Sequence, residues 1–186
     1  MMKGALLFAT ILSVARTAIE ADKMTFLPVP LSETSENITL TTPMYSGYLN
    51  ISETKALHYV FVGSKSENAA TDPVVIWFNG GPGCSSLLGY FQEHGPYVIE
   101  DNTTALIENP YPWNKEANML YLESPAGVGF SINTNESAPA FSDMSQSIDA
   151  FAALEVWYAG FPEFIDNSLF VSGESYAGLY VPYLSW

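Results

Sequence analysis

Short apolar runs alternate with polar turns along most of the chain, and their patterns predict strands of two kinds. Residues 47–51 and 56–62 are β-prone runs separated by a polar turn, which predicts an antiparallel hairpin. Residues 74–78 are continuously apolar, as expected of a strand that is covered on both faces in a mostly parallel sheet. Residues 117–122 predict another buried strand.

Helices are predicted between and after these strands. A glycine-rich turn at residues 79–86 precedes a helical stretch at 87–93 and an extended segment at 97–99. Ser142 has a side chain suited to cap a helix that runs to about Tyr158. The predicted apolar stripe of this helix consists of Met144, Ile148, Phe151, Ala152, Leu154 and Tyr158.

The last part of the chain repeats the alternation of strand and helix. A short apolar strand at residues 169–171 leads into a tight turn around Ser175, after which the sequence becomes helical again. This alternation predicts an α/β fold, with a mostly parallel central sheet, flanking helices and an antiparallel hairpin near the N-terminus. The 186 residues, of which 48% are hydrophobic, suffice for one domain with a substantial core.

The first 15 residues have the features of a secretory signal peptide. Lys3 supplies positive charge, residues 4–14 are apolar, and the small residues before Arg16 suit cleavage. A membrane anchor is the alternative, but the apolar run is shorter than the roughly 20 residues that span a bilayer. We therefore expect entry into the secretory pathway without stable membrane insertion, followed by an extended arm at residues 16–43.

Composition narrows the possible partners. The chain has 20 acidic and 6 basic residues, and its net charge of −14 would repel a polyphosphate backbone, so no nucleic-acid partner is expected. Two scattered histidines and one cysteine show no ligand spacing, so neither a metal nor a cofactor is predicted. Four acceptor sequons predict a secreted glycoprotein, and they begin at Asn37, Asn50, Asn102 and Asn135.

Ser175 is the candidate nucleophile. A serine hydroxyl becomes reactive when a constrained turn exposes it near a base and an oxyanion hole. Residues 173–178 (Gly-Glu-Ser-Tyr-Ala-Gly) lie between a predicted strand and a predicted helix, as such a turn requires, although Ala177 stands where the general pattern has glycine. An ordinary surface serine at the start of a helix is the alternative.

A second candidate motif covers residues 77–86 (Trp-Phe-Asn-Gly-Gly-Pro-Gly-Cys-Ser-Ser). Consecutive glycines after a buried strand let backbone N–H groups point into a cleft, which is how an oxyanion hole is built. A turn without a catalytic role is one alternative. A phosphate-binding loop is another, but the motif lacks the Lys-Ser/Thr ending of a Walker loop.

Together with residues 91–96 (Phe-Gln-Glu-His-Gly-Pro) and 123–131 (Glu-Ser-Pro-Ala-Gly-Val-Gly-Phe-Ser), these motifs resemble the serine carboxypeptidases, an α/β-hydrolase family. The resemblance extends from about Tyr45 to the end of the sequence. It implies the amino-terminal part of an α/β-hydrolase domain at residues 44–186. It also implies the release of C-terminal residues from peptides or proteins through an acyl-enzyme, best in acid.

The resemblance also assigns roles to individual residues. It implies that Ser175 is the nucleophile and that the backbone N–H groups of Gly81 and Tyr176 form the oxyanion hole. Two glutamates can lie beside a substrate carboxylate only if at least one carries a proton, which agrees with activity in acid. Solvated carboxylates at helix ends are the alternative for these two glutamates. The residues implied to bind the substrate's terminal carboxylate are Trp77, Asn79, Glu93 and Glu174.

The rest of a catalytic triad is not found in family order. In α/β hydrolases the acid and the histidine follow the serine, whereas His58 and His94 precede Ser175 and residues 176–186 contain no Asp, Glu or His. In the family, the cysteine that matches Cys84 pairs with one far downstream. The sequence is therefore expected to be a portion of a longer enzyme and to be inactive by itself.

Alternatives to the hydrolase remain open at this point. Related proteins pass the acyl group to a small acceptor, so an acyltransferase is one of them. A catalytically inactive secreted binding remnant is another. Cys84 is expected to be a free thiol, a buried inert thiol, or one whose partner lies outside this sequence. The expected location is extracellular, vacuolar or lysosomal, and the sequence does not predict the oligomeric state.

Overall fold

The computed structural model describes residues 19–27, 38–100, 105–135 and 141–186. The predicted signal segment and the sequons at Asn37 and Asn102 lie outside these ranges, and the predicted arm is described only at 19–27 and 38–43. The strands are β1 (Met44–Asn50), β2 (Lys55–Val62), β3 (Val74–Phe78), β4 (Tyr97–Ile99), β5 (Leu106–Glu108), β6 (Asn118–Leu122), β7 (Ile132–Asn133) and β8 (Leu169–Gly173). The helices are η1 (Gly89–Glu93), η2 (Trp113–Lys115), α2 (Asp143–Gly160), η3 (Pro162–Phe164) and α3 (Ala177–Ser185).

The main sheet has the strand order β1-β2-β6-β3-β8, with β7 paired to β2. The predicted hairpin is present, because β1 and β2 are antiparallel neighbours, and β3 runs parallel to both β6 and β8. These pairings confirm the predicted α/β class. The predicted extended segment at residues 97–99 is also present, but β4 pairs with β5 in a separate two-stranded sheet.

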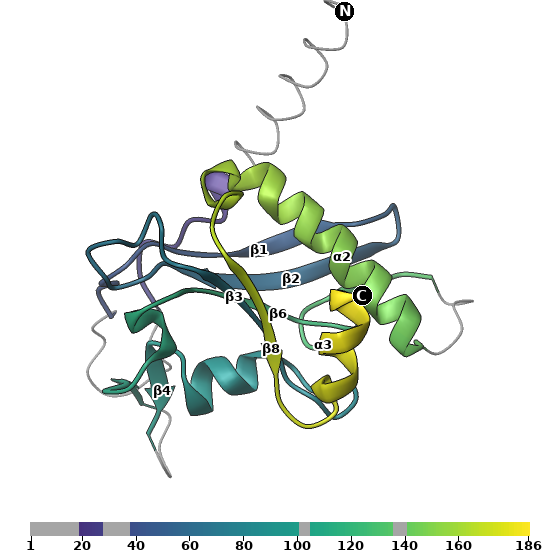
Figure 1. Ribbon diagram of the computed structural model, residues 1–186. Helices are drawn as coiled ribbons and strands as arrows, with labels where there is room; N and C mark the ends of the chain where they lie inside the picture. The colour runs from purple at the N-terminus through teal and green to yellow at the C-terminus, as the bar shows by residue number, and fades with distance from the viewer. Residues whose placement is uncertain (1–18, 28–37, 101–104, 136–140) are drawn as a thin grey trace, which may run out of the picture.

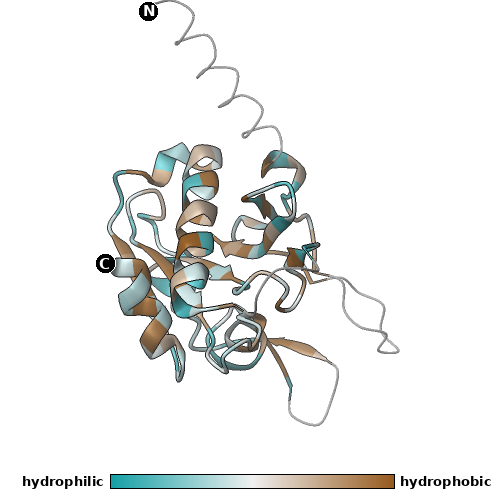
Figure 2. Ribbon diagram, turned by 90° about the vertical axis from the view of Figure 1, so that its right-hand side faces the viewer, coloured by the Kyte–Doolittle hydropathy of each residue, from teal (hydrophilic) through white to brown (hydrophobic). Residues whose placement is uncertain are grey.

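The sheet is the middle of three layers (Figure 1). Along β2, Tyr59 and Phe61 join the core beneath α2 and α3, whereas Val60 and Val62 join a second core on the side of η1. A strand with apolar residues on both faces must be covered on both, which explains the continuous apolar runs in the sequence. Figure 2 shows this as brown strands lying between the helices.

Helix α2 begins where the sequence predicts, but it packs through a different face. The side chain of Ser142 accepts a hydrogen bond from the Ser145 N–H, as a helix N-cap does. The predicted apolar stripe is wrong for Met144, Ile148 and Phe151, which are 48%, 60% and 56% exposed. The face that packs into the core carries both small and large side chains, and its buried positions are Gln146, Ser147, Ala150, Ala153, Leu154, Trp157 and Gly160.

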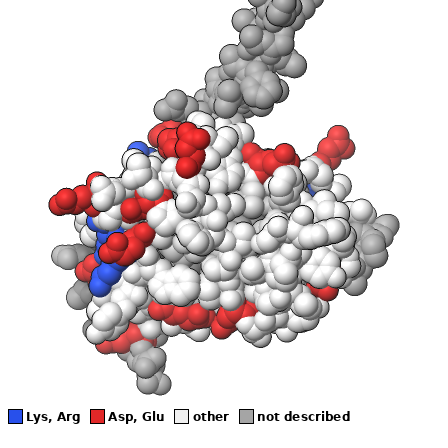
Figure 3. Space-filling view, in the orientation of Figure 1, with Lys and Arg blue, Asp and Glu red and all other residues white. Residues whose placement is uncertain are grey.

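One of these exposed side chains, Phe151, lines an open groove between α2 and β8. Strand β8 stands at the end of the strand order, and Phe170 on it is 57% exposed. In the space-filling view, the surface over α2, β8 and α3 carries few charges (Figure 3). We call this feature the α2–β8 groove, and it is lined by Phe151, Tyr158, Ile165, Leu169, Val171 and Leu184. Within the described ranges, none of the helices is long and apolar enough to cross a bilayer.

Candidate functional site

Two loops leave the sheet side by side and carry most of the predicted site residues. Phe78 at the end of β3 pairs with Gly173 at the end of β8, and the Glu174 N–H donates to the Phe78 carbonyl at 3.2 Å. Because the strands are parallel, the loops that follow them emerge at the same edge of the sheet, where ligands bind in open α/β folds.

Ser175 lies on a constrained turn between β8 and α3. Its φ of 55° is the only positive φ of a non-glycine residue in the described part of the chain. That conformation costs free energy for a residue with a side chain and recurs at functional sites. A β-carbon on Gly173 would lie only 2.6 Å from that of Ala177, so the glycine leaves the room that Ala177 needs.

The glycine-rich loop after β3 lies directly against this turn. A β-carbon on Gly80 would lie 2.5 Å from the backbone nitrogen of Tyr176. Gly81, with a φ of 110°, continues the loop in a conformation that favours glycine. The chain thus brings the two predicted oxyanion-hole segments together, although they are separated by about ninety residues of sequence.

Asn79 connects the residues that were predicted to bind a carboxylate. Its side-chain oxygen accepts hydrogen bonds from Trp77 Nε1 at 2.9 Å and from the Gly89 N–H at 3.0 Å. Its amide nitrogen donates to Glu174 at 2.8 Å and to Glu93 at 3.4 Å. The asparagine is 1% exposed, while both glutamates are exposed, so a buried amide holds two accessible carboxyl groups in one place.

His94 forms part of the aromatic wall beside this cluster. Its ring stacks on Trp113 with 4.2 Å between ring centroids, and its Nδ1 lies 3.1 Å from the Tyr121 hydroxyl. Burial lowers the pKa of His94 to about 4. The ring next to Glu93 therefore stays neutral in moderately acidic solution, and the wall does not acquire a charge there.

Glu123 is an organising residue that the sequence analysis did not single out. It is 0% exposed and accepts hydrogen bonds from Ser85, from the Phe130 N–H at 2.9 Å and from His58 Nδ1 at 3.0 Å. Burial alone would raise the pKa of Glu123, but these hydrogen bonds outweigh burial and keep the pKa below its usual value. The sequence signal that could have identified Glu123 is its position at the start of the Glu-Ser-Pro motif.

Neither histidine contacts Ser175. His58 bonds to Glu123 and Ser46, and His94 lies in the aromatic wall. Cys84 is an exposed free thiol, so its interpretation as a buried thiol is wrong. Across the described residues, no three His, Cys, Asp or Glu side chains are grouped to hold a metal ion.

The comparisons with known proteins agree on one family. A sequence profile described as serine carboxypeptidase matches residues 33–186. The mouse lysosomal protective protein is 49% identical over 141 residues, which cover 76% of this chain and 29% of that protein. Serine carboxypeptidase-like 21 of Arabidopsis thaliana is 41% identical over 187 residues, covering 98% of this chain and 36% of that protein. The chain thus spans about a third of the length of these relatives.

A solved structure shows the same fold. The prohormone-processing carboxypeptidase Kex1(delta)p of Saccharomyces cerevisiae superposes with a TM-score of 0.69 at 26% identity. The superposition covers 89% of this chain and 38% of that structure. The similarity confirms the α/β-hydrolase architecture that the motifs implied, over the part of the fold that this chain contains.

Proposed function

The chain belongs to the serine carboxypeptidase family, and from this premise we propose that the protein hydrolyses the last peptide bond of its substrates through an acyl-enzyme on Ser175. The observation that carries the proposal is the φ of 55° at Ser175, on a turn that touches the Gly80 loop and lies beside the Asn79 cluster. A strained nucleophile next to a loop of backbone donors fits acyl transfer.

The proposed reaction has two steps. Ser175 Oγ attacks the carbonyl carbon of the last peptide bond while its proton passes to a general base. The N–H groups of Gly81 and Tyr176 stabilise the oxyanion, and the C–N bond breaks as the released residue leaves with a proton on its amine. Water then attacks the ester, which frees the shortened peptide and restores the Ser175 hydroxyl.

The Asn79 cluster would restrict the reaction to the C-terminus. Asn79 holds Glu174 at 2.8 Å, immediately before the nucleophile in sequence, and Glu93 at 3.4 Å. A substrate carboxylate can bind beside these groups through a shared proton, which a blocked terminus cannot provide. We therefore propose Trp77, Asn79, Glu93 and Glu174 as the carboxylate-binding residues, and acidic solution as the setting in which they work.

We also propose an extracellular, vacuolar or lysosomal location with N-linked glycans. The similarity to a lysosomal protective protein and the predicted signal segment support this proposal. Of the four sequon asparagines, Asn50 and Asn135 are described, and both are exposed. Exposure is what a glycosylated asparagine requires, because the glycan extends into solvent.

The function is tested in the protein translated from the complete transcript, with amino-terminally blocked dipeptides as substrates. Ser175→Ala should reduce the release of the C-terminal residue by several orders of magnitude, because the acyl-enzyme cannot form. The matched control is Ser185→Ala, which removes a hydroxyl at the end of α3 and should leave turnover unchanged. Turnover that survives Ser175→Ala would exclude the proposed nucleophile.

A further inference from the structure

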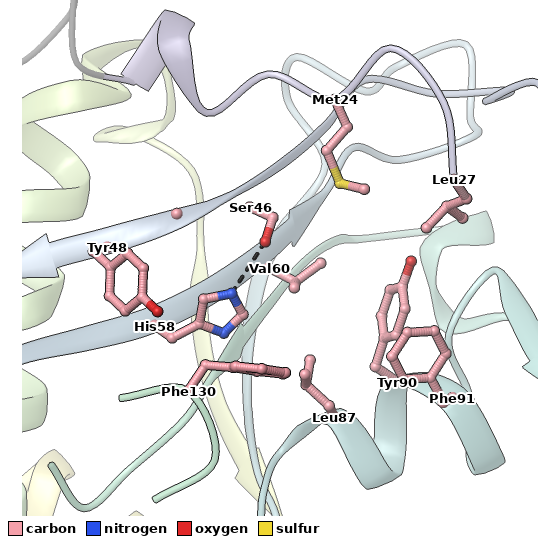
Figure 4. Close-up of a pocket in the computed structure, with 11 residues that line it drawn as sticks. Met24, Leu27, Ser46, Tyr48, His58, Val60, Leu87, Tyr90, Phe91 and Phe130 are labelled. Carbon is pink, nitrogen blue, oxygen red and sulfur yellow. Dashed lines mark hydrogen bonds between the residues drawn. The ribbon is translucent and has the colours of Figure 1, made fainter. Parts of the chain in front are cut away.

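A cavity of about 460 Å³ lies on the face of the sheet opposite α2, between β1, β2 and the helix around η1. Its size falls within the roughly 300–1,000 Å³ that is usual for small-molecule pockets. Figure 4 shows apolar side chains surrounding most of it, and these include Met24, Leu27, Val60, Leu87 and Phe91. Its lining includes neither Ser175 nor the Asn79 cluster, so it is distinct from the site described above.

One wall of the cavity carries a network of three hydrogen-bonded polar residues, Ser46, His58 and Glu123. Ser46 Oγ lies 3.1 Å from His58 Nε2, and His58 Nδ1 lies 3.0 Å from the carboxylate of Glu123 (Figure 4 draws the first of these bonds). A carboxylate only accepts hydrogen bonds, so His58 carries its proton on Nδ1 and, when neutral, accepts at Nε2. Ser46 then donates to His58, and its oxygen keeps lone pairs for a donor in the cavity.

The opposite side of the cavity includes Tyr90, whose hydroxyl has no partner among the residues that the structure describes. Tyr90 is 1% exposed, and its OH makes no hydrogen bond to any described residue. Burial raises the pKa of Tyr90, so the phenol remains a neutral donor. A buried hydroxyl that lacks a partner carries a free-energy cost, because burial removes its hydrogen bonds to water. The Tyr90 oxygen itself is fully buried, so a ligand oxygen can accept from it only if the ring shifts toward the cavity, and such a bond would remove that cost.

Two exposed aromatic rings flank His58 at the edge of the cavity. Tyr48 is 44% exposed and Phe130 is 64% exposed, and each packs edge-on against the imidazole with 5.5 and 5.4 Å between ring centroids. Exposed aromatic rings next to a concave apolar surface are common where small molecules bind. They extend the apolar surface from the interior of the cavity to its rim.

We propose that this cavity binds a neutral apolar molecule that carries a hydroxyl group, which pairs with the Tyr90 hydroxyl or with Ser46. The apolar walls disfavour a charged ligand, because a charge would lose its hydration there. An anion is disfavoured further, since the buried carboxylate of Glu123 lies one side chain behind the cavity wall.

The Ser46–His58–Glu123 network resembles a catalytic triad of serine, histidine and acid. Its structural surroundings, however, fit ligand binding rather than catalysis. Ser46 lies within the regular strand β1, where its N–H donates to the Asp22 carbonyl at 2.9 Å. Ser175 has instead a strained turn and an adjoining glycine-rich loop. A nucleophilic serine needs such a turn and backbone donors for the oxyanion.

The test uses three matched probes, 4-butylphenol, butylbenzene and 4-butylbenzoate, with affinity measured by ligand-observed NMR titration at pH 7. The phenol should bind more tightly than the hydrocarbon, and the benzoate should bind least tightly. Tyr90→Phe or Ser46→Ala should weaken binding of the phenol about five-fold, as expected for one hydrogen bond. Tyr90→Phe should not lower the thermal stability of the protein without ligand, because the hydroxyl it removes has no partner among the described residues.

The control variant is Tyr97→Phe, which removes a buried phenol oxygen that donates to the Thr39 carbonyl at 3.2 Å and does not line the cavity. It should lower stability and leave affinity unchanged, the reverse of Tyr90→Phe. Ser175→Ala should leave affinity unchanged as well, which separates this site from the proposed catalytic one. Equal binding of benzoate and phenol, or unchanged affinity in both Tyr90→Phe and Ser46→Ala, would overturn the proposal.

Discussion

Gly80 and Ser175 are in such close contact that a β-carbon on the glycine would lie 2.9 Å from the β-carbon of the serine. The same added atom would lie 2.8 Å from the Glu174 carbonyl oxygen and 2.5 Å from the Tyr176 nitrogen. All three neighbours belong to the turn that sets the strained conformation of the serine. The shape of the turn therefore depends on the absence of a side chain in the loop opposite.

The first prediction concerns this contact. Gly80→Ala should lower the free energy of unfolding by about 1–3 kcal/mol, because an added methyl group overlaps backbone atoms that cannot move freely. Urea unfolding followed by tryptophan fluorescence would measure the change. Gly178→Ala is the control, since that glycine lies in α3 with nothing within 4 Å of an added β-carbon. It should stabilise the protein by about 0.5–1 kcal/mol, and similar losses in both variants would contradict the argument.

The second prediction concerns the carboxylate cluster in the protein from the complete transcript. Glu174→Gln should raise KM about ten-fold for peptides with a free C-terminus and change KM little for their amides, because only the free acid can share a proton there. Glu93→Gln should act in the same direction with a smaller effect, since Asn79 holds Glu93 at 3.4 Å and Glu174 at 2.8 Å. Steady-state kinetics on paired substrates would measure both.

The control for this cluster is Glu53→Gln, which changes an exposed glutamate in the turn between β1 and β2. Its KM values should match those of the unmodified protein for both substrates. If the Glu174 variant weakened free and amidated peptides equally, the glutamate would be contributing general binding rather than recognition of a terminus.

The sequence predicted most strands and both loops of the site because their signals are local. The continuous apolar run of β3, the glycine-rich loop after it and the turn around Ser175 can each be recognised from consecutive residues of the sequence. Their mutual placement follows from parallel pairing of β3 with β8. That pairing was not among the sequence-based predictions, so the contact between the two loops is known only from the structure.

The features that the sequence did not reveal depend on contacts between distant segments. Large apolar side chains suggested that α2 packs through Ile148 and Phe151, but its buried face combines the small residues Ala150 and Ala153 with Trp157. Likewise, the local sequence around Glu123 does not show that the residue is buried, because the residues that hydrogen-bond to it come from other segments.

The third prediction is a pH dependence of stability that depends on His94. The pKa of His94 is about 4 in the folded protein, compared with roughly 6.5 when unfolded, so the unfolded chain binds the proton more readily. The stabilising contribution is complete above about pH 6.5 and is lost as the pH falls toward 4, at about 1.4 kcal/mol per pH unit. His94→Phe keeps an aromatic ring against Trp113 and should remove this contribution.

Urea unfolding of both proteins at pH 7.0, 5.5 and 4.5 would measure this dependence through tryptophan fluorescence. The difference in unfolding free energy between the parent protein and His94→Phe should shift in favour of the variant as the pH falls. His94 is 5% exposed, so screening by solvent should weaken the effect only slightly. Parallel pH profiles for the two proteins would show that His94 does not carry the effect.

The last prediction concerns the 186-residue chain by itself, expressed from Arg16 to Trp186 in an oxidising host. It should hydrolyse no peptide at a measurable rate, because His58 and His94 are both engaged away from Ser175, which leaves the serine without a base.

It should also self-associate, because the α2–β8 groove exposes apolar side chains beside an edge strand. Replacing Phe151 of α2, which lines the groove, with glutamate should raise the monomer fraction in analytical ultracentrifugation without lowering stability, since this side chain is 56% exposed. Ala153→Glu, at a fully buried position of the same helix, should unfold the chain instead. A parent chain that is monomeric at high concentration and hydrolyses peptides would contradict both parts, because it would show that the groove needs no cover and that Ser175 has a base.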